Sequence, residues 1–567
     1  AFVTDAGFTD IPEIGRQDRP SLYDSSVDRS EPLVPPERRL GLADDVDELS
    51  AAVEALDVEA VAVSLLYSYR DPAREDAVGE AIARRVPHAA VSVSGRVVGE
   101  FREYERASTT ILNAYLAPEM DAYLERLEDR VRQGGIDADI AVMRSSGGLM
   151  SPGDAGALPA AALLSGPAGG VVAASRLGQA LGIDRLISFD MGGTSTDVCR
   201  ITGGEPVVSY ERAIDGYPCR MPAVAVHTVG AGGGSIGWVD DGGALRVGPQ
   251  SAGAHPGPAS YGRGGTAPAV TDANLTLGRL DADIELAGGL RLDAGLAADS
   301  LLSVGSQIGL DVLDTARGMV AIVEEHMAAA IRHITIEEGA DPRDHALVAF
   351  GGAGGLHASA LAKALGMATV IVPAHAGVFS ALGLLLSPPR TDTALSTLLT
   401  SGEGLAAAVA DRMAEARRES GPDATIEASV DVQYVGQSHE MTVPVDGSDS
   451  WDDVCDRFHV AHRRRNGFAR PDDAVEVVTV RAVATGAPAL RWDDLVPPVP
   501  DGEARTGSRS IVLSGGMVDA GVWRREGLAP GDQISGPAIV TEAEATTLLL
   551  PGDRATVDGS GALVVEW

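Results

Sequence analysis

The sequence predicts an α/β fold that is divided into several domains and ends in a mainly β part. The chain has 567 residues, too many for one hydrophobic core, and 45% of them are hydrophobic, which is ample for burial. Up to about residue 386, apolar strand segments alternate with helical segments, as in a mostly parallel or mixed sheet. Farther along, strands dominate between turn signals such as Pro530-Gly-Asp and Pro551-Gly-Asp.

The first segment alternates strands and helices. An apolar strand is predicted over 58–69, and Asp71-Pro72 begins a helix to about residue 85, because proline is tolerated in the first turn. A strand at 90–94, a long amphipathic helix at 103–133 and a strand at 140–143 follow.

The middle segment contains two helices rich in small residues and a hairpin. Small residues on a helix face allow another helix to cross closely. The expected elements are a helix at 171–181, hairpin strands at 186–189 and 198–201, a long helix at 310–339, a strand at 347–350 with a helix to about 365, a strand at 369–372 and a helix at 377–386.

These patterns predict four parts. Residues 1–164 form a first α/β domain, and residues 165–387 form a second one. A stretch rich in Pro, Thr, Ser and Gly predicts a linker at 388–403. Residues 404–567 then form a mainly β domain, after a helix near 405–418.

The composition is strongly acidic and almost free of lysine. The net charge is −36, from 81 acidic against 45 basic residues, and Lys363 is the only lysine. Such a surface favours a halophilic protein, since concentrated salt screens the repulsion; arginine replacing lysine in a GC-rich genome is the alternative. Nucleic acid is not expected as a partner, because no basic face is available for phosphates.

Three further features concern location. The three cysteines show no metal-ligand spacing and fit a reducing cytoplasm. No apolar stretch is long enough to span a bilayer and no secretory signal is apparent, so no membrane association is expected. The chain opens without Met, as in a fragment or a processed product.

Residues 190–197, Asp-Met-Gly-Gly-Thr-Ser-Thr-Asp, predict a turn that binds nucleotide phosphate. Glycines leave backbone N–H groups uncovered, hydroxyls add donors, and a carboxylate can hold Mg²⁺ through its waters. Asp190 and Asp197 are the candidate catalytic carboxylates, and Asp190 is the candidate for Mg²⁺. The candidate phosphate contacts are Gly192, Gly193, Thr194, Ser195 and Thr196. A tight hairpin turn, with Asp190 as a cap and Asp197 as a brace, is the alternative.

Other candidates lie farther along the chain. His227 is a candidate for substrate or metal contact, or a structural histidine. Gly232 and Gly233 could hold an anion through their N–H groups, or form a mobile turn. Asp272 is either an acid in the substrate cleft or part of a helix N-cap. Glu103 and Arg106 are expected to form a surface pair.

The order of these motifs resembles the actin-like ATPase fold shared by acetate and sugar kinases, heat-shock chaperones and actin. That resemblance implies two α/β domains that close on ATP, with connect helices at 165–181 and 377–386. It makes 190–197 the second phosphate hairpin. It also implies an adenosine motif, where a side chain would occupy the place of the nucleotide; its glycines are Gly351, Gly352, Gly354 and Gly355.

At family level the chain resembles the hydantoinase A / 5-oxoprolinase family, in order and from near residue 1 to about residue 560. The segments that carry the resemblance are 14–20, 103–106, 165–170, 190–197, 227–235, 271–274, 350–354, 377–383 and 434–437. Relatives carry a first phosphate hairpin near the N-terminus, which would lie upstream of Ala1 here, so the N-terminal part is expected to be missing and this chain alone to be a weak ATPase.

The resemblance implies an ATP-binding subunit, with Mg²⁺, of an ATP-dependent hydrolase that opens cyclic amides such as hydantoins or 5-oxoproline. ATP would phosphorylate the substrate carbonyl, and a B-type hydantoinase subunit would complete the reaction in a hetero-oligomer. A ketone carboxylase subunit, of the acetone or acetophenone type, is the nearest alternative. A non-catalytic actin-like scaffold that binds nucleotide is the other.

Overall fold

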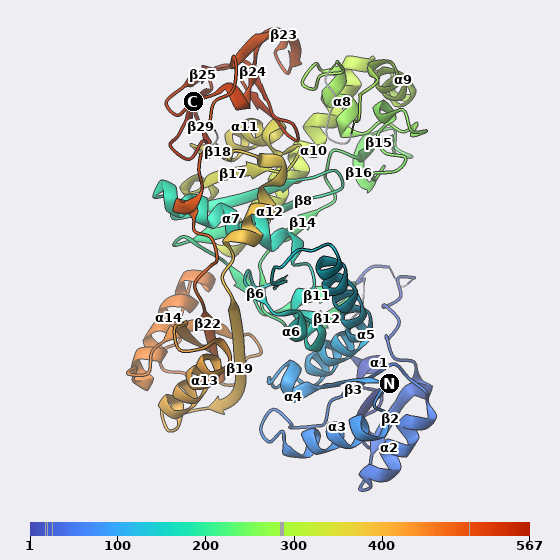
Figure 1. Cartoon of the computed structure of the whole chain (residues 1–567), viewed down its shortest axis with the longest axis vertical. Helices are drawn as coiled ribbons and strands as arrows, with labels where there is room; N and C mark the ends of the chain where they lie inside the picture. The colour runs from blue at the N-terminus through green and yellow to red at the C-terminus, as the bar shows by residue number, and fades with distance from the viewer. Residues whose placement is uncertain (18, 20, 25, 284–288, 498) are drawn as a thin grey trace. The chain divides into compact units, whose positions relative to one another are not determined.

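The computed structural model describes residues 1–17, 19, 21–24, 26–283, 289–497 and 499–567. The chain forms two compact units, each built from segments that are distant in sequence (Figure 1). Unit 1 consists of Ala1–Ser165, Val208–Ala223 and Ser387–Pro488. Unit 2 consists of Gly166–Val207, Val224–Leu386 and Ala489–Trp567.

Unit 1 contains a parallel sheet of four strands in the order β2-β1-β3-β4. The strands are β1 (Phe2–Asp5), β2 (Arg39–Leu42), β3 (Ala60–Val63) and β4 (Ala90–Val93), joined by α1 (Ile11–Ile14), α2 (Val46–Ala55) and α3 (Ala73–Arg85). Val3, Val61 and Val63 of the sheet share a buried core with Val78 and Ile82 of α3, so burial of aliphatic faces holds this layer together.

The long helix α5 (Glu103–Gln133) begins and ends where the sequence predicts it, and α4 (Ser94–Val97) precedes it. Its first turns pack against β3 and β4. The expectation of an exposed Glu103–Arg106 pair is wrong: the Arg106 side chain is fully buried and donates to the Leu65 carbonyl at 2.6 Å as well as to Glu103. A buried charge needs such partners, which local spacing does not reveal.

A second sheet of unit 1 is antiparallel, in the order β19-β22-β20-β21. Its strands are β19 (Arg390–Leu399), β20 (Thr425–Tyr434), β21 (Met441–Val445) and β22 (Val475–Thr485), with α13 (Leu405–Ser420) and α14 (Trp451–Asn466) packed against it. Leu405 of α13 and Phe458 of α14 share its buried core.

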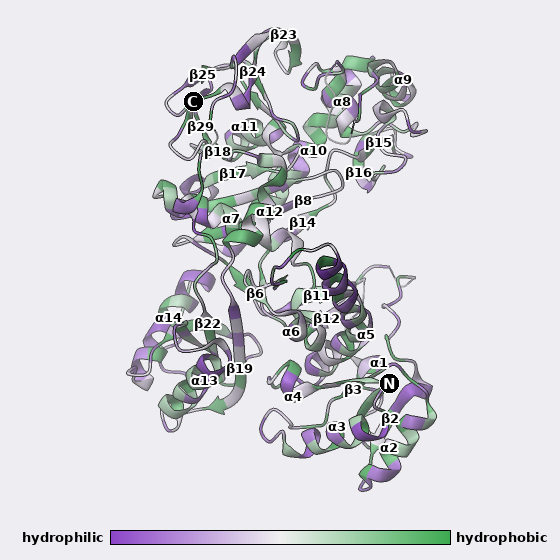
Figure 2. Ribbon diagram, in the orientation of Figure 1, coloured by the Kyte–Doolittle hydropathy of each residue, from purple (hydrophilic) through white to green (hydrophobic). Residues whose placement is uncertain are grey.

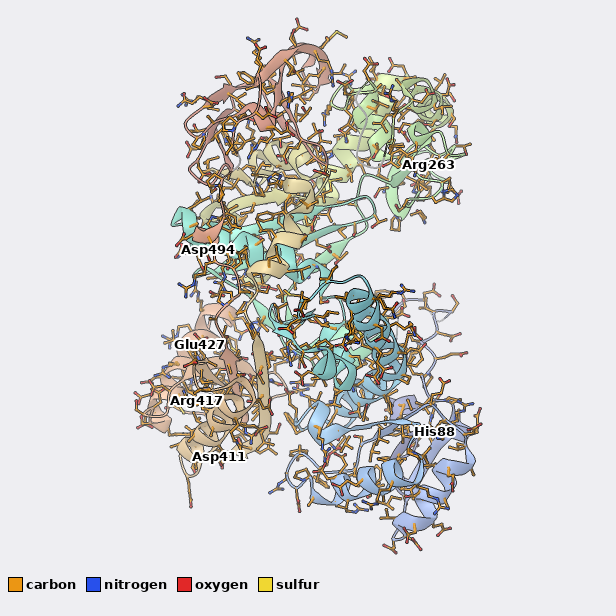
Figure 3. The ribbon with its side chains drawn as sticks, viewed as in Figure 1. His88, Arg263, Asp411, Arg417, Glu427 and Asp494 are labelled. Atoms are coloured by element: carbon orange, nitrogen blue, oxygen red, sulfur yellow. The ribbon has the colours of Figure 1, made fainter. Side chains whose placement is uncertain are left out.

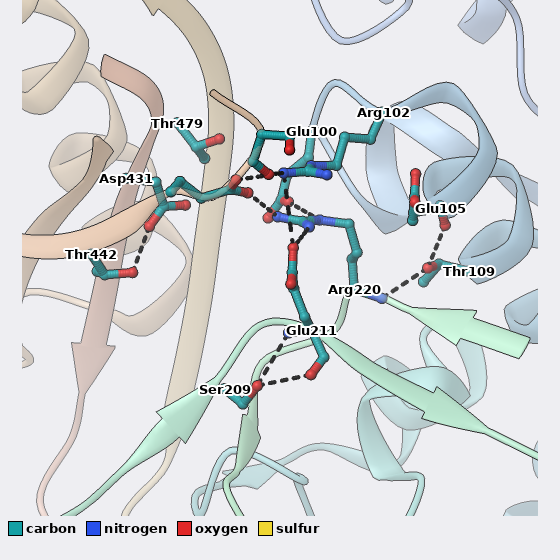
Figure 4. A network of polar contacts seen from close by, with 12 residues as sticks. Glu100, Arg102, Glu105, Thr109, Ser209, Glu211, Arg220, Asp431, Thr442 and Thr479 are labelled. Carbon is teal, nitrogen blue, oxygen red and sulfur yellow. Dashed lines mark hydrogen bonds and ion pairs between the residues drawn. The ribbon is translucent and has the colours of Figure 1, made fainter. Parts of the chain in front are cut away.

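Buried ion pairs link three segments of unit 1 (Figure 4). The carboxylate of Glu100 binds Arg220 at 2.6 Å and Arg481 at 2.7 Å. Arg481 also pairs with Asp431 at 2.7 Å. The side chains of these four residues are at most 4% exposed, and each charge therefore depends on its partners.

Unit 2 is built on a sheet of nine strands. Along its main path the order is β14-β8-β7-β17-β18-β29-β28-β25, with β9 (Glu205–Pro206) paired to β8. The strands are β7 (Arg185–Met191), β8 (Thr196–Thr202), β14 (His227–Val229), β17 (Ala346–Phe350), β18 (Val370–Val372), β25 (Gln533–Ser535), β28 (Arg554–Val557) and β29 (Leu563–Glu566). β7, β17 and β18 run parallel, and the others extend the sheet with antiparallel neighbours.

Two helices of unit 2 cross in close contact, α7 (Gly166–Leu181) and α12 (Phe379–Leu386). A Cβ on Gly383 would overlap the carbonyl of Gly169, and one on Gly169 would lie 2.7 Å from the carbonyl of Ser380. The close crossing expected from the small residues is therefore present. Figure 2 shows hydrophobic colour along α12 and the neighbouring β17.

Further elements complete unit 2. They are β15 (Ser235–Val239), β16 (Leu245–Ser251), α8 (Val270–Thr276), α9 (Ala294–Gly305), α10 (Val312–Ile334) and α11 (Gly354–Leu365). A four-stranded sheet consists of β23 (Arg505–Leu513), β24 (Gly516–Arg524), β26 (Ala538–Thr541) and β27 (Thr546–Leu549).

The structure changes the expected division into four parts. The predicted linker 388–403 contains strand β19, whose threonines suit a half-buried sheet. The predicted C-terminal domain, 404–567, does not form one unit: residues up to Pro488 belong to unit 1, whereas residues from Ala489 belong to unit 2. Strand β29 pairs with β18, so the end of the chain completes a sheet that begins much earlier.

The charged side chains of Asp411, Arg417 and Glu427 in unit 1 are exposed (Figure 3). Among the described residues no single helix has the length and apolar composition needed to cross a membrane. One bent pair, Ala294–Ile308 with Val312–Glu338, meets both criteria together.

Candidate functional site

The candidate site lies in unit 2, where the adjacent parallel strands β7 and β17 end. β7 continues into the turn 192–195 and returns as β8, and β17 continues into Gly351. Phe350 pairs with Asp190 across the two strands, so the two turns emerge side by side. Ligands of open α/β sheets bind at this edge, outside the carboxyl ends of the strands.

Asp190 is half-buried near the end of β7 and accepts a hydrogen bond from the Ser380 hydroxyl at 3.0 Å. Burial raises the pKa of Asp190 to about 6, and the charge of Asp197 adds to the shift. The carboxylate is oriented yet still ionised near neutral pH, which suits a group that holds Mg²⁺ through water. One carboxylate suffices for that role, and no cluster of three or more metal-ligating side chains occurs in the described part of the chain.

The tip of the hairpin is a compact turn with exposed donors. The N–H of Gly192 donates to the Ser195 carbonyl at 3.1 Å, which closes the turn. Gly193 and Thr194 are exposed, and within the described chain their N–H groups have no hydrogen-bond partner. With the hydroxyls of Thr194 and Ser195, these groups form a set of donors that fits phosphate oxygens.

Thr196 does not belong to that donor set, which corrects the sequence prediction. Its side chain is fully buried and its hydroxyl donates to the Ala231 carbonyl at 2.5 Å. Strand alternation turns it away from the neighbouring Asp197 and into the core. Thr196 therefore fixes the hairpin to the loop beneath it.

The predicted anion contact through the N–H groups of Gly232 and Gly233 is also corrected. Their N–H groups are already used: Gly232 donates to the Ser235 hydroxyl at 2.8 Å, and Gly233 donates to the Gly192 carbonyl at 3.0 Å. A Cβ on Gly232 would lie 2.7 Å from the backbone N of Ser195. Glycine is needed here because the loop packs directly against the turn 192–195.

Asp197 lies directly opposite Asp190 in the hairpin register. Its carboxylate accepts a hydrogen bond from the Thr228 hydroxyl at 2.5 Å, and burial raises its pKa. The bond ties β8 to β14, in agreement with a bracing role, and the half-buried side chain stays beside the turn.

The Gly351 turn touches the hairpin. Gly351 has φ +78°, and a Cβ there would overlap Asp190 Oδ1 and lie 2.5 Å from the Met191 carbonyl.

The other glycines of the predicted adenosine motif pack against residues 544–547. Gly352 is exposed, with the Glu544 carbonyl 3.2 Å from the position of a Cβ. The buried Gly354 and Gly355 begin α11, and a Cβ on Gly355 would lie 2.6 Å from the Thr547 hydroxyl. Close packing against residues 544–547 thus requires glycine at Gly355, without invoking a nucleotide.

His227 does not lie at the turn. It pairs with Val198 in the sheet, and its ring centre is 4.4 Å from that of His333 on α10. Burial, with the neighbouring His333, lowers its pKa. His227 therefore packs between β14 and α10, in agreement with the structural alternative.

Asp272 is likewise structural rather than an acid in a substrate cleft. Its side chain is fully buried, and its carboxylate accepts N–H donors from Ala259, Ser260 and Ala269 at 2.8–3.1 Å. The bond to Ala269 caps the start of α8, as the N-cap alternative predicts.

Two contributors to the site are missed by sequence reasoning. Ser380 of α12 orients Asp190, and Glu544 of the C-terminal segment lies against Gly352 and Gly377. Ser380 is 190 residues from Asp190 in sequence, and Glu544 is likewise distant from both glycines, so no local motif encodes these contacts. The small residues of α12 predict a close helix crossing, but they do not predict that Ser380 reaches the hairpin.

Three family models match the chain in sequence. The Hydantoinase/oxoprolinase N-terminal region matches residues 1–86, Hydantoinase/oxoprolinase matches 106–393, and the C-terminal domain of the same family matches 390–563. The family's N-terminal part is thus represented in the chain, and the expectation that it is missing is wrong. In the segment 14–20, Asp18 and Pro20 lie outside the described residues.

Relatives from several kingdoms align with most of the chain. An uncharacterized protein of Methanocaldococcus jannaschii is 35% identical over 100% of this chain and 88% of its own length. The caprolactamase alpha subunit of Pseudomonas jessenii is 34% identical over 89% of this chain and 75% of its own. The 5-oxoprolinase of Saccharomyces cerevisiae is 29% identical over 98% of this chain, which spans 48% of that protein.

Two solved structures share the fold. The ATP-dependent caprolactamase of Pseudomonas jessenii has a TM-score of 0.88 at 31% identity, with 100% of this chain and 88% of that chain covered. Nucleotide-free acetone carboxylase has a TM-score of 0.76 at 26% identity, with the same coverage. The chain has the predicted α/β fold of actin-like ATPases, followed by a C-terminal part rich in β-strands.

Proposed function

This chain belongs to the hydantoinase/oxoprolinase family, and from that membership we propose that it is the ATP-binding subunit of an ATP-dependent cyclic-amide hydrolase. The substrate class is a lactam or a related ring of the hydantoin or 5-oxoproline type. The proposed cofactors are ATP and Mg²⁺, and the proposed partner is a B-type subunit in a cytoplasmic hetero-oligomer. The observation that carries the proposal is the family-typical turn with Asp190 at its edge.

Different residues at the turn are proposed to contact the phosphate oxygens and Mg²⁺. The N–H groups of Gly193 and Thr194, with the hydroxyls of Thr194 and Ser195, receive phosphate oxygens. Asp190 would hold Mg²⁺ through water, and Ser380 keeps its carboxylate in one orientation. Gly351 allows the second turn to approach that carboxylate without a side chain between them.

ATP supplies a transferable phosphoryl group, which explains why opening an amide ring would require ATP. The amide is stabilised by resonance, so its carbon is a poor electrophile. A bond from the carbonyl oxygen to phosphorus, formed as the bond to ADP breaks, gives an activated carbon and a good leaving group. Water then adds to that carbon, and the ring C–N bond breaks with the nitrogen leaving as a protonated amine. Hydrolysis of the acyl phosphate that remains gives a carboxylate and inorganic phosphate, and the partner subunit is proposed to complete these steps.

A ketone carboxylase subunit is the second candidate, because the fold is shared with acetone carboxylase at a TM-score of 0.76. Both reactions activate a carbonyl oxygen, so the phosphate turn does not separate them. Carboxylation consumes bicarbonate, whereas ring opening does not. Turnover of a cyclic amide in bicarbonate-free buffer would exclude the carboxylase.

The test is calorimetry with Mg-ATP on the wild-type chain and on Asp190→Ala. Asp241→Ala, an exposed aspartate of the same unit, is the matched control. We expect Asp190→Ala to weaken binding at least tenfold and the control to bind like wild type. Absence of binding to the folded wild-type chain overturns the proposal. Binding without ADP release in the presence of cyclic amides and the partner indicates the non-catalytic scaffold.

A further inference from the structure

Unit 1 contains a cavity of about 770 Å³ that the phosphate site does not use. Three segments that carry the family resemblance converge on it, and they contribute Ile14 to Arg16, Glu103 with Tyr104, and Gln437. Its volume falls within the range of roughly 300–1,000 Å³ that is typical of small-molecule sites.

The cavity lies where the topology of the sheet favours a ligand. In the order β2-β1-β3-β4, the chain leaves β1 toward one edge and β3 toward the other. Gly7 and Phe8 follow the carboxyl end of β1, and Leu66 and Tyr67 follow that of β3. This reversal of strand order opens a crevice at the carboxyl ends, which is the usual ligand position in open α/β sheets.

Aromatic side chains form much of the wall. Only 4% of the chain is aromatic, yet five of the seventeen lining residues are, namely Phe8, Tyr67, Tyr69, Phe101 and Tyr104. Phe8 and Tyr67 are 44% and 64% exposed. Such a concentration of rings provides flat apolar surface for a small ring-shaped ligand.

The wall is held in a strained but well-supported conformation. Tyr67 and Arg102 have φ of +61° and +67°, which side chains other than glycine rarely adopt. The Glu103 carboxylate accepts the Tyr67 N–H at 3.1 Å and pairs with the buried Arg106. Strain that is stabilised by such a network is typical of binding sites.

Three of the four charged side chains of the wall are paired within the protein, and the fourth, Asp10, is an exposed acid. Arg16 binds Glu105 through two hydrogen bonds of 2.7 Å, Arg102 pairs with Glu440, and Glu103 pairs with Arg106. A ligand would therefore find little unpaired charge from these residues. This favours an uncharged ligand over a carboxylate.

Two buried polar atoms of lining residues lack partners among the residues that the structure describes. One is an acceptor, Gln433 Oε1, on a side chain that is only 6% exposed and donates through Nε2 to Glu476 at 3.1 Å. The other is a donor, Arg102 Nε. Unsatisfied buried groups are costly unless a ligand pairs with them.

We infer that this cavity binds the ring of a neutral cyclic amide, whose N–H and C=O lie side by side and match one acceptor and one donor. The inference rests on the proposed function and adds the position and charge of the substrate. A lactam without a carboxylate is the preferred ligand, and 5-oxoproline is disfavoured by its charge.

The probe is ε-caprolactam, titrated calorimetrically into the full chain with and without Mg-ATP. The key variant is Tyr67→Gly, which removes a ring but suits the positive φ, so the fold should be retained. We expect it to weaken caprolactam binding at least tenfold, and Gln433→Leu to weaken it as well. Tyr123→Ala, which removes an exposed ring elsewhere on α5, should bind like wild type.

Nucleotide binding separates this inference from the proposed function. Tyr67→Gly and Gln433→Leu should bind Mg-ATP like wild type, and Asp190→Ala should keep caprolactam binding. If caprolactam does not bind the wild-type chain under either condition, or binds the two cavity variants unchanged, or binds more weakly than 5-oxoproline, the inference is wrong. If caprolactam binds as expected but Mg-ATP does not, the proposed function fails and the cavity assignment stands.

Discussion

Asp190 and Asp197 are cross-strand partners in the β7–β8 hairpin, and two half-buried carboxylates therefore lie opposite each other beside the turn 192–195. Burial, and then the charge of Asp197, raises the pKa of Asp190 to about 6. The hydrogen bond from Ser380 opposes that shift without cancelling it. The protein keeps a carboxylate at this position although its charge is disfavoured in the folded state, which is typical of a functional group.

Asp190→Asn should stabilise the chain in metal-free buffer at pH 8. The raised pKa means that the native state binds more protons than the unfolded state between roughly pH 3.9 and the folded pKa of about 6. Stability is therefore lost as the pH rises through that window, by at most about 3 kcal/mol. Asparagine carries no charge at this position and avoids that loss of stability. The gain in unfolding free energy of Asp190→Asn over wild type should therefore be present at pH 8 and fade toward pH 4.

Urea unfolding from pH 4 to pH 8 measures that gain, with Asp241→Asn as the control. A gain that is equal at every pH would contradict the assignment of the titration to Asp190. The same variant should bind Mg-ATP poorly, so that stability and function change in opposite directions.

Thr194 and Thr196 should respond differently to the same substitution. Thr194→Val removes an exposed hydroxyl and should weaken Mg-ATP binding with little change in stability. Thr196→Val removes the donor to the Ala231 carbonyl and should cost about 1 kcal/mol of unfolding free energy. Calorimetry and urea unfolding on both variants check the contrast. Equal losses of stability would show that the hairpin is arranged differently.

Gly351 and Gly193 provide a second matched pair. Alanine at Gly351 meets Asp190 and the Met191 carbonyl at a positive φ, and should destabilise the chain by roughly 1–3 kcal/mol and impair nucleotide binding. Alanine at Gly193 meets nothing within 4 Å and should leave stability unchanged. Thermal unfolding distinguishes the two, and a stable Gly351→Ala would contradict the close contact of the turns.

Local patterns were sufficient for the elements that position the site. The bounds of α5, the two strands of the hairpin and the small-residue character of α7 and α12 follow from periodicity and from residues such as Gly169 and Gly383. These features depend on neighbours within one or two turns of helix or along one strand, and sequence carries that information directly.

The features that the sequence did not predict depend on contacts between distant segments. The glycines at 232–233 support the turn because Gly233 donates to the Gly192 carbonyl and the preceding Ala231 carbonyl accepts from Thr196. From local sequence alone, the same glycines could equally have faced an anion. Strand β29 joins β18 through a register that no local pattern specifies. Helix α14 is not among the predicted elements, although its start has a local signal. The capping box at Ser450 and Asp453 is visible in the sequence.

Glu100→Gln should destabilise unit 1 strongly at neutral pH. Burial alone would raise the pKa of Glu100, but the guanidinium groups of Arg481 and Arg220 outweigh it and hold the pKa below its ordinary value. Removing the charge leaves both arginines short of a partner in a buried site, at a cost of about 3 kcal/mol or more. Glu125→Gln, at an exposed position of α5, should cost far less.

The pH dependence of this loss has a defined sign. A lowered pKa stabilises the native state above the unfolded pKa, and that stabilisation disappears as the pH falls through the folded value. The difference between wild type and Glu100→Gln in urea unfolding should therefore narrow as acid protonates Glu100. A difference that widens in acid would mean that Arg220 and Arg481 do not depend on the Glu100 carboxylate, and that another acid neutralises them.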